Sequence, residues 1–346
     1  MILKRTLFLI LLFITTAVSA QDLQRILDLR GTWKFELGKN REFVKPDFDD
    51  TDWEDIYVPS SWEDEGFANY DGFACYRKTF YLDEKLKAAD LIIRLGYIDD
   101  ASEIYLNGYF VGYSGMLPPH YVTAYDVEQQ YPLLNKYLKY GKEKNVIAVR
   151  VYDNQQEGGM VRGQIGIYQN VSYSGKYALK LPETWKFADD DDPDFKSPDF
   201  DDSDWIKVSI PADWETQGFS DYDGIGWYRV KITIPESLKN DELIVLLGKI
   251  DDVDESYFNG KLIGKTGRIP AHGKTYDYNE EYKEIRAYEI PSELIQYGKE
   301  NTIAVRVYDS YFHGGIYDGP LYIIKKSDFK PSKTKKSKYQ FLKDMF

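Results

Sequence analysis

The stretch that decides the fold occurs twice in the chain. PDFDDTDWEDIYVPSSWEDEGFANYDGFACYR occupies Pro46–Arg77, and PDFDDSDWIKVSIPADWETQGFSDYDGIGWYR occupies Pro198–Arg229. When both copies are extended back to Phe43 and Phe195, 18 of 35 positions are identical without a gap. A repeat of this length is a duplicated domain, because a solenoid repeat spans only about 20–50 residues.

The repeat continues along the chain in register. GYIDDASEIYLNGYFVGYSG at Gly96–Gly115 matches GKIDDVDESYFNGKLIGKTG at Gly248–Gly267. NVIAVRVYD at Asn145–Asp153 then matches NTIAVRVYD at Asn301–Asp309. The second copy carries extra residues near 280–286, which shifts the offset between the copies. We therefore expect two similar domains in tandem.

Short strands dominate the pattern within each copy. Asn107-Gly108 and Asn259-Gly260 each lie between two β-rich runs, and Asn-Gly between such runs predicts a type I′ hairpin. The apolar runs Leu91–Leu95 and Leu243–Leu247 end at glycine, as buried strands often do. Helical periodicity is scarce. The sequence predicts an all-β protein made of two tandem jelly-roll β-sandwich domains.

The two ends of the chain differ from the repeats. Residues 1–20 have a charged start, an apolar run and a small-residue end (Val18-Ser19-Ala20), which predicts a signal peptide and a secreted or periplasmic protein. A membrane anchor is the alternative, but the apolar run is shorter than the roughly 20 residues that span a bilayer. We place the domains at 21–175 and 176–328, and a basic flexible tail at 329–346. We expect no transmembrane segment in the mature chain.

Composition excludes several classes of partner and cofactor. The net charge of −13 argues against nucleic acid, which is bound by basic surfaces. One cysteine, Cys75, excludes an internal disulfide and a cysteine zinc site, and three histidines leave little room for a histidine-rich metal centre. We expect no cofactor, although a structural calcium ion held by loop oxygens stays open.

The combined motifs resemble a known family. FDDSDW, IDDVDESYFNGKLIG, NTIAVRVYD and GGIYDGP are similar to the sugar-binding domain of glycoside hydrolase family 2, a non-catalytic jelly roll of bacterial β-galactosidases and β-glucuronidases. The resemblance covers residues 29–173 and 181–325. It implies weak carbohydrate binding. The catalytic barrel of such enzymes needs about 200 or more residues and two carboxyl groups about 5–5.5 Å apart across the scissile bond. No stretch resembles that barrel, so we expect no catalysis by this chain.

One repeated segment combines aromatic, acidic and arginine side chains, the groups that bind sugar faces and hydroxyls. The resemblance implies that Asp71 and Asp223 lie near the position from which a loop residue of β-galactosidase-type members reaches into the active site of the neighbouring barrel. The alternative is structural, because Tyr and Trp fill sandwich cores and a buried Arg pairs with a carboxylate. The candidates are Trp62, Glu63, Tyr70, Asp71 and Arg77 in the first copy, and Trp214, Glu215, Tyr222, Asp223 and Arg229 in the second.

Histidines and a glycine-rich loop add further candidates. His120 and His272 lie in matching loops, and His313 borders Gly314-Gly315 at the position that Glu157 occupies in the first copy. The two loops would therefore bind ligands differently.

Two acidic motifs have structural interpretations. Asp-Phe-Asp-Asp-x-Asp-Trp is a candidate calcium loop, but Asx turns above a packed Trp53 or Trp205 are favoured. Asp99-Asp100-x-x-Glu103 and its counterpart are expected to hold Arg150 or Arg306.

Three functions remain open from the sequence. The first is a carbohydrate-binding accessory protein in the degradation of glycans outside the cytoplasm. The second is a non-catalytic subunit of a glycosidase or acetylesterase that works with a separate hydrolase. The third is an interaction scaffold that binds no sugar.

Overall fold

The computed structural model describes residues 23–171, 177–220, 222–270, 280–311 and 313–329. The predicted signal peptide, the predicted domain boundary at 175/176, His272 and the tail beyond Phe329 lie outside these described residues. Within the described part, no helix is long and apolar enough to cross a membrane.

The first repeat forms ten of the described strands. They are β1 (Leu23–Asp28), β2 (Gly31–Leu37), β3 (Glu54–Val58), β4 (Gly72–Phe80), β5 (Leu91–Ile98), β6 (Ala101–Leu106), β7 (Tyr109–Ser114), β8 (Glu128–Leu133), β9 (Asn145–Asp153) and β10 (Met160–Asn170).

The second repeat forms ten equivalent described strands. They are β11 (Tyr177–Lys180), β12 (Thr184–Ala188), β13 (Ile206–Ser209), β14 (Gly224–Thr233), β15 (Leu243–Asp251), β16 (Val253–Phe258), β17 (Lys261–Thr266), β18 (Ile285–Ile290), β19 (Glu300–Asp309) and β20 (Gly315–Lys325).

Only short 3₁₀ turns interrupt the strands in the described residues. They are η1 (Glu42–Val44), η2 (Glu84–Leu86), η3 (Asn135–Tyr137), η4 (Pro193–Lys196), η5 (Glu215–Gln217), η6 (Glu236–Leu238), η7 (Glu281–Lys283), η8 (Ser292–Leu294) and η9 (Lys326–Asp328).

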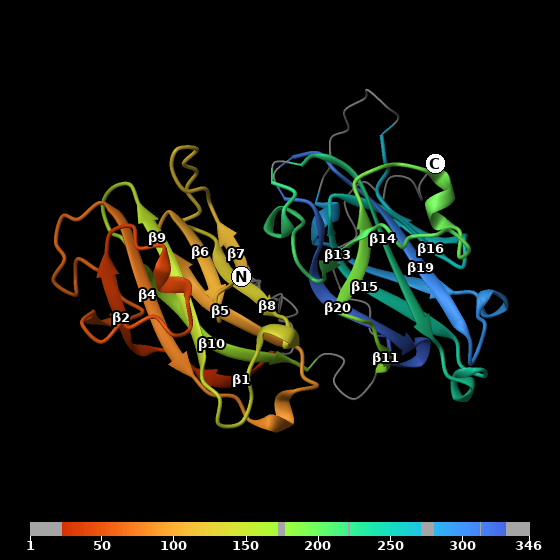
Figure 1. Cartoon of the computed structure of the whole chain (residues 1–346), viewed down its shortest axis with the longest axis horizontal. Coiled ribbons are helices and arrows are strands. Elements are labelled where there is room, and N and C mark those ends of the chain that lie inside the picture. The colour runs from red at the N-terminus through yellow and green to blue at the C-terminus, as the bar shows by residue number, and fades with distance from the viewer. Residues whose placement is uncertain (1–22, 172–176, 221, 271–279, 312, 330–346) are drawn as a thin grey trace, which may run out of the picture.

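Each repeat is a sandwich of one four-stranded and one six-stranded antiparallel sheet. The strand orders are β1-β10-β5-β8 and β3-β2-β4-β9-β6-β7 in the first domain. In the second they are β11-β20-β15-β18 and β13-β12-β14-β19-β16-β17, the same orders ten strands later. The two sandwiches lie side by side along the long axis (Figure 1). The predicted fold class, two tandem β-sandwich domains, is confirmed.

The predicted hairpins are also confirmed. Asn107 and Gly108 join β6 to β7 with φ angles of 52° and 88°, and Asn259 and Gly260 join β16 to β17 with 46° and 80°. Both residues of a type I′ turn need positive φ, which Asn and Gly adopt most readily. The amide of Asn107 also donates to Asn145 at 2.9 Å, and Asn259 repeats this bond to Asn301 at 2.8 Å.

Each domain buries its own apolar core between its two sheets. The first core contains Trp33, Phe35 and Tyr76, and the second contains Trp185, Phe187 and Tyr228 at equivalent strand positions. Alternate residues of each strand face this core, as the two-residue period of a strand requires. Cys75 is buried in a smaller cluster with Phe43 and Trp53, and burial raises the pKa of its thiol to about 11.

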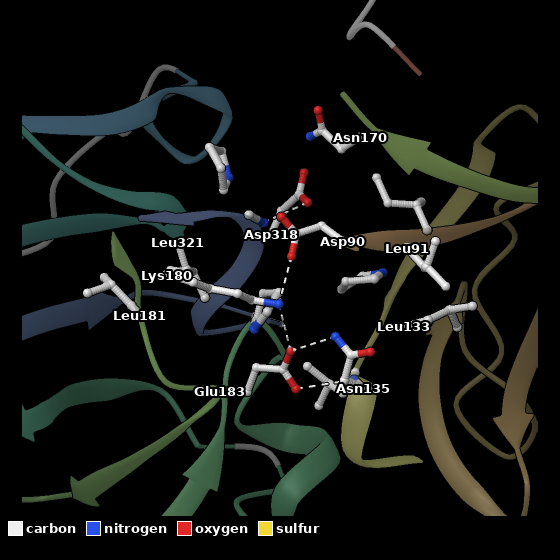
Figure 2. Close-up of a pocket in the computed structure, with 16 residues that line it drawn as sticks. Asp90, Leu91, Leu133, Asn135, Asn170, Lys180, Leu181, Glu183, Asp318 and Leu321 are labelled. Atoms are coloured by element: carbon white, nitrogen blue, oxygen red, sulfur yellow. Dashed lines mark hydrogen bonds and ion pairs between the residues drawn. The ribbon is translucent and has the colours of Figure 1, made fainter. Parts of the chain in front are cut away.

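The domains contact each other through a polar network beside an apolar pocket. Lys180 Nζ lies 2.9 Å from Asp90 Oδ1 and 3.2 Å from Glu183 Oε1, and Glu183 in turn accepts the Asn135 backbone N–H at 3.2 Å (Figure 2). The cavity itself measures about 60 Å³, enough for a few water molecules. Because these polar groups bond to each other across the boundary, the network fastens the two domains together.

Candidate functional site

The Asp-rich motif forms a turn over a packed tryptophan, as the structural interpretation predicted. Asp49 accepts the Thr51 backbone N–H at 3.1 Å, and the Phe48 ring lies 5.5 Å from the Trp53 ring. Asp201 accepts the Ser203 N–H at 3.0 Å in the second copy. Side-chain oxygens that bond nearby backbone groups stabilise such turns without a metal ion.

The two candidate arginines brace this turn and do not face a ligand. Arg77 is only 3% exposed, and its Nε donates to Asp50 at 2.6 Å while its Nη1 donates to the Lys45 carbonyl at 3.1 Å. Arg229 is similarly buried and donates to Asp202 at 2.8 Å. Because a buried guanidinium satisfies its donors inside the protein, the sugar-binding role expected for both arginines does not fit the structure.

The candidate tryptophans are also core residues. Trp62 and Trp214 are both 0% exposed, so neither ring face is available for stacking on a sugar. The partly buried Tyr70 packs edge-on against Trp62, and its hydroxyl donates to the Phe73 carbonyl at 2.8 Å. Tyr222 repeats this arrangement, with its hydroxyl 2.7 Å from the Ile225 carbonyl. The aromatic part of the predicted site is therefore structural.

Both candidate glutamates fasten the glycine-rich loop. Glu63 accepts the Gly158 N–H at 3.0 Å, and Glu215 accepts the Gly314 N–H at 3.1 Å. A Cβ on either glycine would lie 2.0 Å from the Trp62 or Trp214 ring, so only glycine lets the loop approach so closely. This contact holds the glycine-rich loop, which carries Glu157 in the first domain and His313 in the second, beside the aspartates at the strand ends.

Carboxylates from four strand ends gather at one end of each sandwich. In the second domain, β15 ends at Asp251, Asp252 follows it, and β19 ends at Asp309. Strand register places Asp309 opposite Gly224, directly after the exposed Asp223. The first domain repeats this set of carboxylates. We call the set the acidic rim in both domains. It consists of Asp71, Asp99, Asp100 and Asp153 in the first domain, and of Asp223, Asp251, Asp252 and Asp309 in the second.

Burial and nearby carboxylates raise the pKa values of four rim carboxyls, Asp99, Asp153, Asp251 and Asp309. Burial, reinforced by neighbouring carboxylates, raises the pKa of Asp153 to about 7 and that of Asp309 to about 8. The same causes raise the pKa of Asp99 to about 6 and that of Asp251 to about 9. Asp71 is among the neighbours of Asp153, and Asp223 among those of Asp309. The predicted pair Asp71 and Asp223 thus belongs to the rim.

Sequence reasoning missed Asp153 and Asp309 as site residues. The signal was present, because both repeats of NxIAVRVYD end in this Asp at the close of a strand. It also expected the Asp99-Asp100-x-x-Glu103 motif to hold Arg150. Glu103 does bind Arg150, at 2.9 Å, whereas Asp100 accepts the Asn154 N–H at 2.7 Å and stays at the rim.

The histidine candidates differ in exposure and in their partners in the structure. His120 and Glu157 are exposed in the first domain. His313 is 36% exposed, and its Nδ1 lies 3.5 Å from Asp213 Oδ2. Burial alone would lower the pKa of His313, but Asp213 and Glu215 raise it. Asp213 corresponds to Ser61, so the Asp–His pair exists in the second copy alone.

The rims therefore present hydrogen-bond acceptors in a partly buried, negatively charged setting. Such groups can accept the hydroxyls of a polar neutral ligand or bind a hard cation. The fold and site together define a tandem pair of β-sandwich modules, each with one acidic end.

Comparison with known proteins finds relatives that match part of this chain. A β-galactosidase of Bacteroides ovatus is 31% identical over 157 residues, which cover 42% of this chain and 17% of that protein. A putative β-glucuronidase of Formosa agariphila is 28% identical over 176 residues, 47% of this chain and 16% of that protein. The large subunit of a β-galactosidase from Leuconostoc lactis is 28% identical over 207 residues, 46% of this chain and 31% of that protein. A scan against models of protein families finds no match.

Among solved structures, a β-glucuronidase from glycoside hydrolase family 2 aligns with 85% of this chain and 28% of its own, at 14% identity and a TM-score of 0.38. A Bacteroides uniformis β-glucuronidase aligns with 83% of this chain and 28% of its own, at 16% identity and a TM-score of 0.36.

The resemblance to glycoside hydrolase family 2 is confirmed, since the homologues are β-galactosidases and β-glucuronidases matched over part of their length. The chain spans about a sixth of the length of the first two relatives.

Proposed function

We propose that this chain is an exported, non-catalytic carbohydrate-binding protein that supports glycan degradation by other proteins. The observation that carries the proposal is the acidic rim, which recurs at the same end of both sandwiches with Asp71 and Asp223 exposed on it. Exposed carboxylates bind pairs of sugar hydroxyls as acceptors, and the relatives are named for acting on β-galactosides and β-glucuronides.

The proposed binding differs from the one the sequence alone favours. Because Trp62 and Trp214 are buried, contact with a sugar would run through carboxylates and backbone groups of the rim instead of an aromatic platform. A single site that contacts only the hydroxyls of a sugar binds it weakly. Two rims in one chain raise the overall affinity for a polymeric glycan through effective concentration.

A glycan array probed with the full chain tests this proposal. The panel includes β-galactosides and β-glucuronides as oligomers and polymers. We expect binding to polymers, a large loss in Asp71→Ala or Asp223→Ala, and a larger one in the double variant. Asp52→Ala and Asp204→Ala serve as matched controls, because both carboxylates are exposed and neither belongs to the acidic rim. An empty array up to millimolar ligand, or binding that both Asp variants leave unchanged, would overturn the proposal and favour a scaffold that binds no sugar.

A second candidate function is a subunit that works with a separate catalytic chain. One relative favours it, since it is named as the large subunit of a β-galactosidase. Co-purification of a hydrolase with the native chain, together with activity on chromogenic glycosides that is absent from the isolated chain, would support this candidate over free carbohydrate binding.

A further inference from the structure

We propose that the acidic rim of the second domain binds one divalent cation, calcium, through Asp251, Asp252 and Asp309. This site goes beyond the proposed carbohydrate binding and does not depend on it. It lies where β15 and β19 end and where the turn between β15 and β16 brings two aspartates together.

The distances fit a cation. One carboxylate oxygen from each of Asp251, Asp252 and Asp309 lies within 4.8 Å of the other two. Two oxygens that each lie about 2.3–2.6 Å from a calcium ion can be at most about 5 Å apart. The three carboxylates can therefore share one ion without rearrangement of the strands, and together they offer up to six hard oxygen ligands.

A second observation points to a ligand at this place. Asp309 is 0% exposed, and its Oδ2 has no hydrogen-bond partner among the described residues. Its Oδ1 accepts the Tyr311 N–H at a long 3.4 Å. A buried carboxylate oxygen without a partner costs free energy, and natural proteins supply such an oxygen with a donor, a water molecule or a metal ion. One carboxylate oxygen of Asp309 belongs to the group of three.

The acidic groups around the site also favour the binding of a cation. The charged neighbours that affect Asp251 are Asp252, Asp309 and Asp213, and those that affect Asp309 are Asp252, Glu215 and Asp223. All of them are acidic. The basic groups nearby are paired with other carboxylates: Arg286 lies 3.0 Å from Asp254, and His313 lies 3.5 Å from Asp213. A divalent ion would offset most of the charge of the three ligands, which burial makes costly.

Buried hydrogen bonds hold the turn that carries the proposed ligands Asp251 and Asp252. Arg286 is fully buried, and its Nη2 donates to the Asp252 carbonyl at 2.7 Å while its Nε donates to Asp254 at 3.0 Å. Asp252 also accepts the Ser310 hydroxyl at 2.6 Å, which ties it to the residue after Asp309. Hydrogen bonds that hold the ligands in place are typical of metal sites that bind tightly.

The first domain lacks this convergence and provides an internal control. Its equivalents Asp99, Asp100 and Asp153 do not form a group within the same distance among the described residues. Gln129 replaces Arg286 there and bonds Ser102 at 2.8 Å in place of the buried ion pair. We therefore expect one cation per chain, in the second domain.

Calorimetric titration of the metal-stripped full chain with CaCl₂ tests the proposal, with calorimetric unfolding as a second readout. We expect one site with a Kd of about 10⁻⁴–10⁻³ M, as in extracellular calcium modules, and an upward shift of Tm when calcium is added. Asp309→Asn should weaken binding at least about tenfold and abolish the shift. If that variant does not fold by circular dichroism, Asp251→Asn provides the same test.

Asp153→Asn is the matched control, and it should bind calcium like the wild-type chain. Absence of binding heat and of a Tm shift at millimolar CaCl₂ would overturn the proposal. So would magnesium binding without calcium binding, calcium binding that survives both Asp309→Asn and Asp251→Asn, or an equal loss in Asp153→Asn.

Discussion

The imidazole of His313 packs against the ring of Tyr113 across the domain boundary, with ring centroids 4.4 Å apart and ring planes inclined by 32°. Tyr113 belongs to β7 of the first domain, whereas His313 precedes β20 of the second and pairs with Asp213. The loop at the rim of the second domain is thus in contact with the neighbouring sandwich. The equivalent Glu157 of the first domain is exposed.

Replacement of His313 by glutamate, the residue found at this position in the first copy, should loosen this contact. The variant loses the ring contact and places a carboxylate near Asp213. We expect a loss of about 1 kcal/mol, the usual value of a ring pair, and a larger radius of gyration by small-angle scattering. Tyr113→Leu, which keeps an apolar side chain, should lose less. Unchanged stability and size in His313→Glu would contradict this role.

The buried ion pair Asp254–Arg286 should couple strongly to the stability of the second domain. Both side chains are fully buried and lie 3.0 Å apart. Asp254→Ser leaves the buried guanidinium without its carboxylate and should cost about 3–5 kcal/mol in the free energy of unfolding by denaturant. The double variant Asp254→Ser/Arg286→Gln copies the Ser102–Gln129 pair of the first domain and should recover part of the loss. A single variant as stable as the wild-type chain would refute the argument.

The thiol of Cys75 should be unreactive in the folded protein. It is fully buried, and burial raises its pKa to about 11, so the reactive thiolate is scarce at neutral pH. Titration with a chromogenic disulfide at pH 8 should show almost no reaction until denaturant is added, and then one thiol per chain. Rapid labelling of the native chain would show that the pocket around Cys75 is open.

Glu215 should make stability depend on pH. Burial raises its pKa to about 7, so the folded state holds the proton more tightly than the unfolded state does. Its contribution to stability is therefore fully present below about pH 4.5 and is lost as pH rises through 7. Glu215→Gln should reduce the fall in Tm over this interval. Glu63→Gln is the matched variant, because Glu63 is the equivalent glutamate of the first domain. Identical pH profiles for Glu215→Gln and the wild-type chain would show that Glu215 does not titrate in this way.

Much of the fold was predictable because local signals and the repeat agree. The Asn107-Gly108 and Asn259-Gly260 turns carry their backbone geometry in the residue types, and the strand runs between them are short and β-branched. The duplication doubles each signal, since a pattern found in both copies is unlikely to be accidental.

The candidate site was predictable only in part. Residue type cannot show whether an aromatic ring faces the core or a ligand, which is why Trp62 and Arg77 were assigned to a site although both are buried. Asp71 and Asp223 were found from the family resemblance. The sequence could not show that Asp309 lies close to Asp251, because their proximity depends on strand pairing between segments more than fifty residues apart. The contact of His313 with Tyr113 depends on how the two domains pack.

We propose that this chain binds a glycan and leaves it intact. Saturation-transfer NMR on the purified full chain with p-nitrophenyl β-glycosides measures both properties in one sample, because bound ligand gains a difference signal and cleaved ligand releases nitrophenol. We expect difference signals on the sugar protons, lost in Asp71→Ala/Asp223→Ala, and no nitrophenol after prolonged incubation. Absence of any difference signal at millimolar ligand, or steady release of nitrophenol by the chain alone, would contradict the account.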